Sequence, residues 1–204
     1  MPLTVKICGV RDAASARAAA RADHAGFVFA PGRRRTVDVP TARALRPLLG
    51  AARAVGVFLE VPLPQVRAIA DAVGLDAVQL HGPVSPADCA ALAPLAVWRA
   101  VAVDEAFDPA QLAAFVPHVA AFVLDAATPG GGRPFDHARV AHLRLGRPWI
   151  LAGGLTPETV ADAIARTRPD GVDCASGIER DGHPDPARVA AFIENARRAE
   201  EATH

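Results

Sequence analysis

The 204-residue sequence has no surplus of charge of either sign, because 22 acidic residues balance 22 basic ones. Proteins that bind nucleic acid or anionic membranes through general electrostatics carry a basic surplus. We therefore expect neither a nucleic-acid partner nor a membrane partner. Tyrosine is absent, and the basic residues include a single lysine, Lys6. In a chain that otherwise uses arginine, this one lysine is a feature to explain.

Cysteine is scarce, and long apolar runs are lacking. The three cysteines are too widely spaced for a disulfide framework or for the paired ligands of a structural zinc site. No apolar run approaches the ~20 residues that span a bilayer. Lys6 and Cys8 interrupt the first apolar stretch, so we expect no signal peptide. These absences predict a cytoplasmic protein.

What the sequence does contain is a regular alternation of short apolar runs and stretches of helical period. The apolar runs are residues 3–9, 25–30, 53–60, 76–82, 96–103, 119–126, 148–154 and 170–177. The candidate helices are residues 12–22, 40–50, 63–74, 85–93, 108–115, 136–144, 156–166 and 185–200. Near-continuous apolar runs are typical of parallel strands that are buried on both faces.

Eight consecutive strand–helix units predict a closed (β/α)8 barrel of the α/β class. At 51% hydrophobic, the chain can bury one substantial core but is short for two, so we expect a single domain over residues 1–204. An open doubly wound sheet is the alternative. That fold usually carries a glycine-rich dinucleotide fingerprint after its first strand, and this sequence has none there.

Active sites of such barrels lie at the carboxyl ends of the strands. Gly153 and Gly154 follow the seventh apolar run, and Ala175, Ser176 and Gly177 follow the eighth. Small residues let backbone N–H groups approach an anion, and these two loops commonly form the phosphate site. Glycine also simply makes turns, but its presence at both loops predicts a site for a small phosphorylated molecule.

Asp125 ends the sixth apolar run and should emerge at the pocket rim. Burial there raises the pKa of a carboxyl group and suits it to general-acid catalysis, whereas capping of the next loop is the alternative role. The glycine-rich residues 128–136 that follow predict a mobile loop that closes over a substrate.

Cys8 holds the matching place on the first run, either as a reactive thiol or as an inert buried residue. Side chains two apart on a strand share a face, so Lys6 should lie one layer below Cys8. We hypothesise that Lys6 pairs with Asp173 on the neighbouring eighth strand and favours the Cys8 thiolate. A structural ion pair without effect on Cys8 is the alternative. If Asp173 faces inwards, Cys174 on the same strand should point towards the helices. Cys89 should be a packing residue of the candidate helix 85–93.

Two further polar features stand at strand ends. The loop Arg33–Arg35 follows the second run, either as a bidentate site for a substrate carboxylate or as a solvated charged loop. His81 ends the fourth run. No second histidine or carboxylate stands at metal-ligand spacing from it, so we expect a polar wall of the pocket rather than a metal site.

Together these stretches resemble the phosphoribosylanthranilate isomerase family. The matching segments, in order from about residue 4 to 194, are "KICGVRD", "GFVFAPGRRRTV", "VGVF", "VQLHG", "LDAATPGGGRPFD", "LAGGLTPETV" and "GVDCASGIE". The chain departs at Ala175, where the family often has serine, and at His137, where an aromatic residue is frequent.

This resemblance implies a (β/α)8 barrel that uses no cofactor and no metal. It implies an Amadori rearrangement of N-(5-phosphoribosyl)anthranilate to 1-(2-carboxyphenylamino)-1-deoxyribulose 5-phosphate, in tryptophan biosynthesis. Cys8 would be the general base and Asp125 the general acid. Arg35 aligns with the arginine that meets the anthranilate carboxylate.

Two other functions stay open. Another sugar-phosphate aminoaldose isomerase would share the fold, but the histidine-pathway enzyme works with two aspartates, and here the first strand ends in Cys8. A non-catalytic phosphate-binding barrel would keep the loops, and the Cys8–Asp125 pair argues against it. The sequence leaves the oligomeric state open, with a homodimer as one option.

Overall fold

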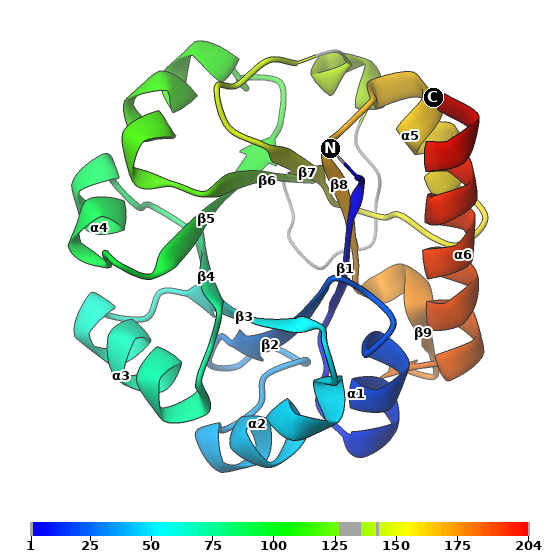
Figure 1. The fold of residues 1–204 in the computed structure, drawn as a ribbon. Coiled ribbons are helices and arrows are strands. Elements are labelled where there is room, and N and C mark those ends of the chain that lie inside the picture. Colours follow the sequence, from blue (N-terminus) through cyan, green and yellow to red (C-terminus); the bar gives the residue numbers. More distant parts are fainter. Residues whose placement is uncertain (1, 127–135, 142, 204) are drawn as a thin grey trace.

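Eight parallel strands close into a barrel in the computed structural model, which describes residues 2–126, 136–141 and 143–203 (Figure 1). Each strand pairs with the next along the chain, and the last pairs with the first. The strands are β1 (Thr4–Cys8), β2 (His24–Phe29), β3 (Arg53–Leu59), β4 (Ala77–His81), β5 (Ala96–Val103), β6 (Ala121–Ala126), β7 (Trp149–Leu151) and β8 (Gly171–Cys174). The predicted fold class is confirmed, and the open-sheet alternative is wrong because β1 and β8 are not edges.

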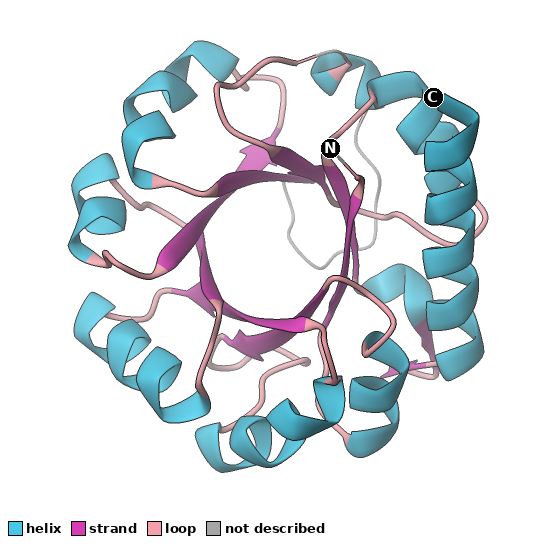
Figure 2. Ribbon diagram, viewed as in Figure 1, coloured by secondary structure: helices cyan, strands magenta, loops and turns pink. Residues whose placement is uncertain are grey.

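Helical segments surround the barrel on its outside (Figure 2). They are α1 (Ala13–Ala19), α2 (Val39–Leu45), η1 (Arg46–Leu49), α3 (Leu63–Val73), α4 (Pro86–Ala91), η2 (Pro109–His118), η3 (His137–Val140), α5 (Val160–Thr167), η4 (Ser176–Ile178) and α6 (Pro186–Thr203). After η4, a short hairpin of β9 (Glu179–Arg180) and β10 (His183–Pro184) leads into α6. No helix of the described part of the chain is long and apolar enough to cross a membrane.

Two of the predicted helices differ in type, and one differs in its start. The segments η2 and η3 are 3-10 helices. Within η2, Pro117 has no backbone N–H to donate to the preceding turn. The helix α5 begins at Val160 rather than near residue 156, because the Thr156 hydroxyl accepts the N–H of Glu158 and forms a turn first.

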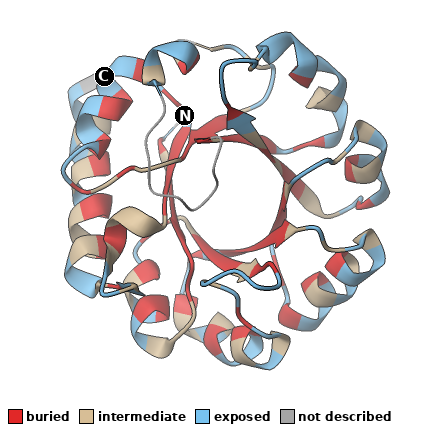
Figure 3. Ribbon diagram, turned by 180° about the vertical axis from the view of Figure 1, so that it is seen from behind, coloured by how far each residue is buried: buried red, intermediate tan, exposed pale blue. Residues whose placement is uncertain are grey.

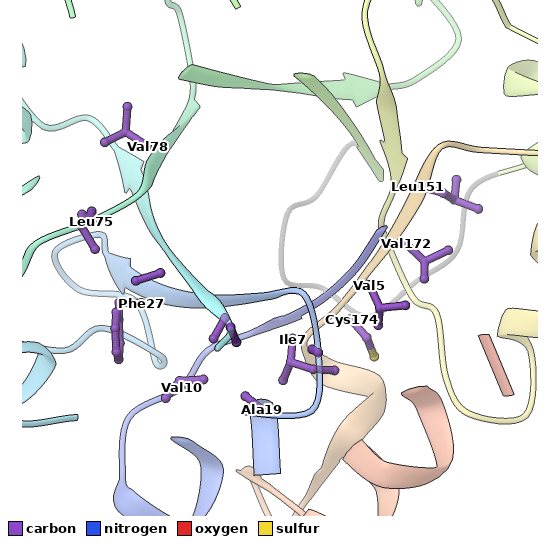
Figure 4. Close-up of a cluster of buried hydrophobic side chains, with 14 of the residues drawn as sticks. Val5, Ile7, Val10, Ala19, Phe27, Leu75, Val78, Leu151, Val172 and Cys174 are labelled. Carbon is purple, nitrogen blue, oxygen red and sulfur yellow. The ribbon is translucent and has the colours of Figure 1, made fainter. Parts of the chain in front are cut away.

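The alternation of side chains along each strand separates two apolar cores. One lies between the strands and the surrounding helices, where Val5, Ile7 and Cys174 point outwards (Figure 4). The strands are buried while the outer faces of the helices are exposed (Figure 3). The other core fills the barrel interior with mostly small side chains: Val55, Ala77, Trp98, Ala100, Ala121, Val123, Ile150 and Ala152. Of these residues, Ala100 and Ala152 line a pocket at the carboxyl ends of the strands.

Candidate active site at the carboxyl ends of the strands

A pocket of about 900 Å³ opens at the carboxyl ends of the strands. A smaller cavity of about 210 Å³ lies at the opposite end of the barrel, beside the ring contact of His24 with Trp98. The larger pocket is lined by most of the predicted site residues: Cys8, Arg35, His81, Asp125, Gly153, Gly154, Asp173, Ala175 and Ser176. Lys6 is fully buried two residues before Cys8, and Gly177 follows Ser176.

Lys6 and Asp173 form a buried ion pair below Cys8. The Lys6 Nζ lies 2.6 Å from Asp173 Oδ2, and the two residues are in register on β1 and β8. Burial alone would lower the pKa of Lys6, but Asp173 and Cys8 raise it above its ordinary value, so Lys6 is an ammonium group. This is the pairing that the strand alternation predicts.

The thiol of Cys8 is less acidic than we expected. Burial raises its pKa most strongly, the Lys6 ammonium lowers it, and the Asp173 carboxylate raises it again. The sum of these effects raises the pKa of Cys8 above its ordinary value. Lys6 therefore acts on Cys8 in the direction we hypothesised, but desolvation outweighs it in the free enzyme.

Gly26 on β2 makes room for Lys6 and Cys8, a role that was not predicted from the sequence. A Cβ atom at Gly26 would lie 2.9 Å from Cys8 Sγ and 3.3 Å from Lys6 Cε. Any larger residue would therefore displace the thiol or the ammonium group. The available signal was a glycine inside the second apolar run, residues 25–30, since a glycine within a strand often marks such a close approach.

Asp125 stands at the end of β6 with a pKa raised to about 6. Burial is the main cause, and the hydrogen bond that its Oδ1 accepts from Ala126 N at 2.8 Å opposes it. A Cβ at Gly153 would lie 2.9 Å from that same oxygen, so Gly153 packs against the carboxyl group. Residues 128–135, where we predicted a mobile loop, lie outside the described residues.

The loops after β7 and β8 meet backbone to backbone. Gly153 and Gly154 have φ angles of 86° and 70°, a region that favours glycine. A Cβ at Gly177 would lie 1.9 Å from the Leu155 carbonyl oxygen, which also accepts from Cys174 Sγ at 3.0 Å. The two loops that we predicted for phosphate binding are therefore held together. Cys174 is directed away from the pocket, as the strand alternation predicts.

Replacing Gly177 with alanine is expected to separate these loops, because its methyl group has no room beside Leu155. We expect kcat/KM to fall by about 10²-fold, mostly through a higher KM. Steady-state kinetics and inhibition by inorganic phosphate would measure this. Gly74→Ala is the control, since nothing lies within 4 Å of its Cβ position at the end of α3. Its left-handed φ of 72° strains the alanine, so this variant loses stability without touching the two loops and should keep the wild-type KM. An unchanged KM in Gly177→Ala would contradict the loop assignment.

The three arginines after β2 differ in their burial and in their contacts. Arg33 is exposed, as a solvated loop residue would be. Arg35 is largely buried and donates from Nε and Nη2 to the two carboxylate oxygens of Glu179, at 2.8 and 2.9 Å. Arg34 reaches the same carboxylate from the surface at 2.5 Å. Glu179 ends the motif "GVDCASGIE", and no role for it was predicted from the sequence.

His81 forms part of the polar wall with Gln79. Burial lowers the pKa of His81 to about 4, helped by the charges of Lys6 and Arg99, so the ring is neutral at physiological pH. Its Nε2 lies 2.9 Å from Gln79 Nε2. The Gln79 nitrogen can only donate, so His81 Nε2 accepts. Among the residues that the structure describes, no three side chains of the metal-ligating types come together.

Comparison with known proteins gives a consistent result. Residues 5–195 match the family described as N-(5'phosphoribosyl)anthranilate (PRA) isomerase. The N-(5'-phosphoribosyl)anthranilate isomerase of Roseiflexus castenholzii is 44% identical, and the match covers 97% of this chain and 99% of the relative.

Solved structures agree with this match. The crystal structure of phosphoribosyl anthranilate isomerase from Thermotoga maritima superposes with a TM-score of 0.87 at 33% identity, over 97% of this chain and 100% of that one. A phosphoribosyl anthranilate isomerase in complex with reduced 1-(o-carboxyphenylamino)-1-deoxyribulose 5-phosphate superposes with a TM-score of 0.84 at 32% identity, with the same coverage.

Proposed function

The chain belongs to the N-(5'-phosphoribosyl)anthranilate isomerase family of tryptophan biosynthesis, and from this premise we propose that Cys8 and Asp125 catalyse its Amadori rearrangement. The observation that carries the proposal is that both groups line one pocket from separate strands, Cys8 on β1 and Asp125 on β6. Cys8 supplies the general base and Asp125 the general acid. The isomerisation needs no more, because the substrate nitrogen itself accepts the electrons.

The pocket offers a place for each end of the substrate. The loops after β7 and β8 present small residues to the phosphate, and Arg35 presents a guanidinium group to the anthranilate carboxylate. The sugar then lies between the strands that carry Cys8 and Asp125. The product analogue bound by the related isomerase has the same two anionic ends, a carboxyphenylamino group and a 5-phosphate.

The first step opens the furanose ring. Protonated Asp125 donates its proton to the ring oxygen while the bond between C1 and that oxygen breaks. The electron pair on the substrate nitrogen forms the new C1–N double bond, which gives a protonated imine. A carboxyl group with a pKa of about 6 is far better suited to this donation than an ordinary aspartate, with a pKa of about 3.9.

The second step moves the hydrogen from C2. The Cys8 thiolate removes the C2 proton, and the electrons of the C–H bond neutralise the iminium nitrogen and give an enolamine. The enol hydroxyl then loses a proton while C1 gains one, which yields the ketone. The proton on Cys8 must return to Asp125 before the next turnover, so acid and base are restored together.

The free-enzyme pKa values predict a flat-topped pH profile. Activity requires Asp125 protonated, with a pKa of about 6, and Cys8 ionised, with a pKa raised above its usual range. Below about pH 6 the fraction of enzyme in the active protonation state, and with it kcat/KM, rises tenfold per pH unit as Cys8 ionises. Above that pH the loss of the Asp125 proton offsets further ionisation, so kcat/KM stays level until Cys8 itself titrates.

Kinetics from pH 5 to 10 would show this profile, and carboxyl ¹³C NMR would follow Asp125 directly. The NMR titration separates Asp125 from the substrate phosphate, whose second pKa is also about 6. An Asp125 carboxyl group that titrates near the ordinary value of about 3.9 would contradict the prediction.

The overall function is tested by following the loss of fluorescence of synthetic phosphoribosylanthranilate. Turnover that depends on both Cys8 and Asp125 supports the proposal. Tight binding of phosphate ligands without turnover would favour the non-catalytic barrel. Conversion of a histidine-pathway aminoaldose alone would favour the other isomerase.

A further inference from the structure

We propose that Glu179 is a positioning residue that orients Arg35, so that the free edge of the guanidinium group faces the pocket and receives the substrate carboxylate. The inference rests on the proposed function and deepens it. Glu179 comes directly after η4 and begins the hairpin β9–β10, 144 residues along the chain from Arg35.

The contact between the two side chains uses one edge of the guanidinium group. Its Nε and Nη2 donate in parallel to Glu179 Oε1 and Oε2, at 2.8 and 2.9 Å. A guanidinium group has five N–H donors in a fixed plane, and this edge uses two of them. The other edge, formed by Nη1 and the second hydrogen of Nη2, keeps the geometry that suits a second carboxylate. Within the described residues, Nη1 has no hydrogen-bond acceptor.

The arrangement is held in place on several sides. A Cβ at Gly9 would lie 2.7 Å from Arg35 Cδ, so the side chain lies directly over the turn that follows Cys8. The carbonyl oxygen of Gly182, in the hairpin that Glu179 begins, accepts from Arg11 and from Arg34. These contacts join the loops after β1, β2 and β8. The side chains of Arg35 and Glu179 are only 11% and 7% exposed, so their geometry is fixed by packing.

The charges at this point leave room for one more anion. Arg34 and Arg35 share a single carboxylate, so the group Arg34, Arg35 and Glu179 carries a net charge of +1. A simple Arg35–Glu179 pair would be neutral and would attract a substrate carboxylate weakly. Glu179 therefore fixes the direction of Arg35 without cancelling its charge, because Arg34 supplies the second cation.

The test compares two ligands by calorimetry in wild type, Arg35→Ala and Glu179→Gln. The first ligand is reduced 1-(o-carboxyphenylamino)-1-deoxyribulose 5-phosphate, and the second is the same molecule without its carboxyl group. We expect Arg35→Ala to abolish the preference for the first ligand. We expect Glu179→Gln to weaken the first about tenfold or more and to leave the second within about twofold.

Glu194→Gln is the matched control, since it removes only the exposed pair of Glu194 with Arg21, at 3.5 Å, and should bind both ligands as wild type does. Should Glu179→Gln fail to fold, Glu179→Asp retains the charge on a shorter side chain, shifts Arg35, and is expected to weaken the first ligand selectively.

Three outcomes would overturn the inference. Wild-type binding of both ligands by Glu179→Gln would show that Arg35 needs no orientation. Equal weakening of both ligands would show that Glu179 only supports the loop. Retention of the carboxylate preference in Arg35→Ala would overturn the carboxylate site in the proposed function as well, which distinguishes that failure from the other two.

Discussion

Cys8→Ser and Asp125→Asn are each expected to lower kcat/KM by about 10²–10⁴-fold, the range that positioned acid or base groups contribute. A serine hydroxyl is far too weakly acidic to ionise in a pocket that already raises the pKa of a thiol. An asparagine cannot donate a carboxyl proton to the ring oxygen. Fluorescence-based kinetics on phosphoribosylanthranilate would measure both losses.

A control variant and a stability measurement distinguish a loss of catalysis from a loss of folding. Cys174→Ser changes a cysteine of the adjacent strand whose side chain lies in the outer core and donates to the Leu155 carbonyl oxygen. Serine can donate the same hydrogen bond, so this variant should keep most activity. Asp125→Asn should be at least as stable as wild type at neutral pH. Because the folded pKa of Asp125 is raised to about 6, the protein loses stability as the pH rises from about 3.9, where the unfolded carboxyl group ionises, to about 6, and the asparagine variant has no such loss. An active Cys8→Ser enzyme would contradict the assignment of the base.

Lys6→Met is expected to lower the free energy of unfolding by about 3–5 kcal/mol, because it leaves the Asp173 carboxylate buried without its cation. The lost contact is the 2.6 Å ion pair, whose lysine is completely buried. By contrast, Arg21→Met removes an exposed pair with Glu194 and should cost less than about 1 kcal/mol. Denaturant unfolding of the two variants would measure the difference.

The same substitution should further raise the pKa of Cys8. Lys6 lowers that pKa and Asp173 raises it, so removing Lys6 alone leaves Asp173 opposed only by the smaller effect of Arg35. The double variant Lys6→Met with Asp173→Asn should recover much of the stability, with a thiol pKa below that of Lys6→Met. Alkylation rates against pH, in a background without the other two cysteines, would report the thiol directly. An unchanged thiol pKa in Lys6→Met would exclude an electrostatic role for the lysine.

Much of the site was predicted from the periodicity of side chains along the strands and from the order of the strands. The period of two along a strand placed Lys6 on the same face as Cys8, and Cys174 on the face opposite to Asp173. The closing of eight strand–helix units made β1 and β8 neighbours, which identified Asp173 as the partner of Lys6. These inferences succeeded because each depends only on neighbours within a strand or on the order of strands.

Features that depend on packing between distant segments were not predicted. The extent of burial around Cys8 decides the direction of its pKa shift, and composition gives no measure of that burial. The hydrogen bonds between Arg35 and Glu179 join residues 144 apart in the sequence. Glu179 lies in a hairpin that the alternation of strands and helices does not predict. Glycine is needed at positions 26 and 177 because a Cβ atom at either position would lie within 3 Å of another segment.

By itself, the sequence determined the closed barrel, the family and the strand ends that carry the site. Hydrophobic periodicity and short motifs are local properties of the chain, so they are present in the sequence whatever the tertiary contacts are. Only the tertiary structure decided which side chains touch across the pocket and how far water is excluded from them. Electrostatic shifts and close contacts depend on distances in space, and the spacing of residues along the chain does not specify these distances.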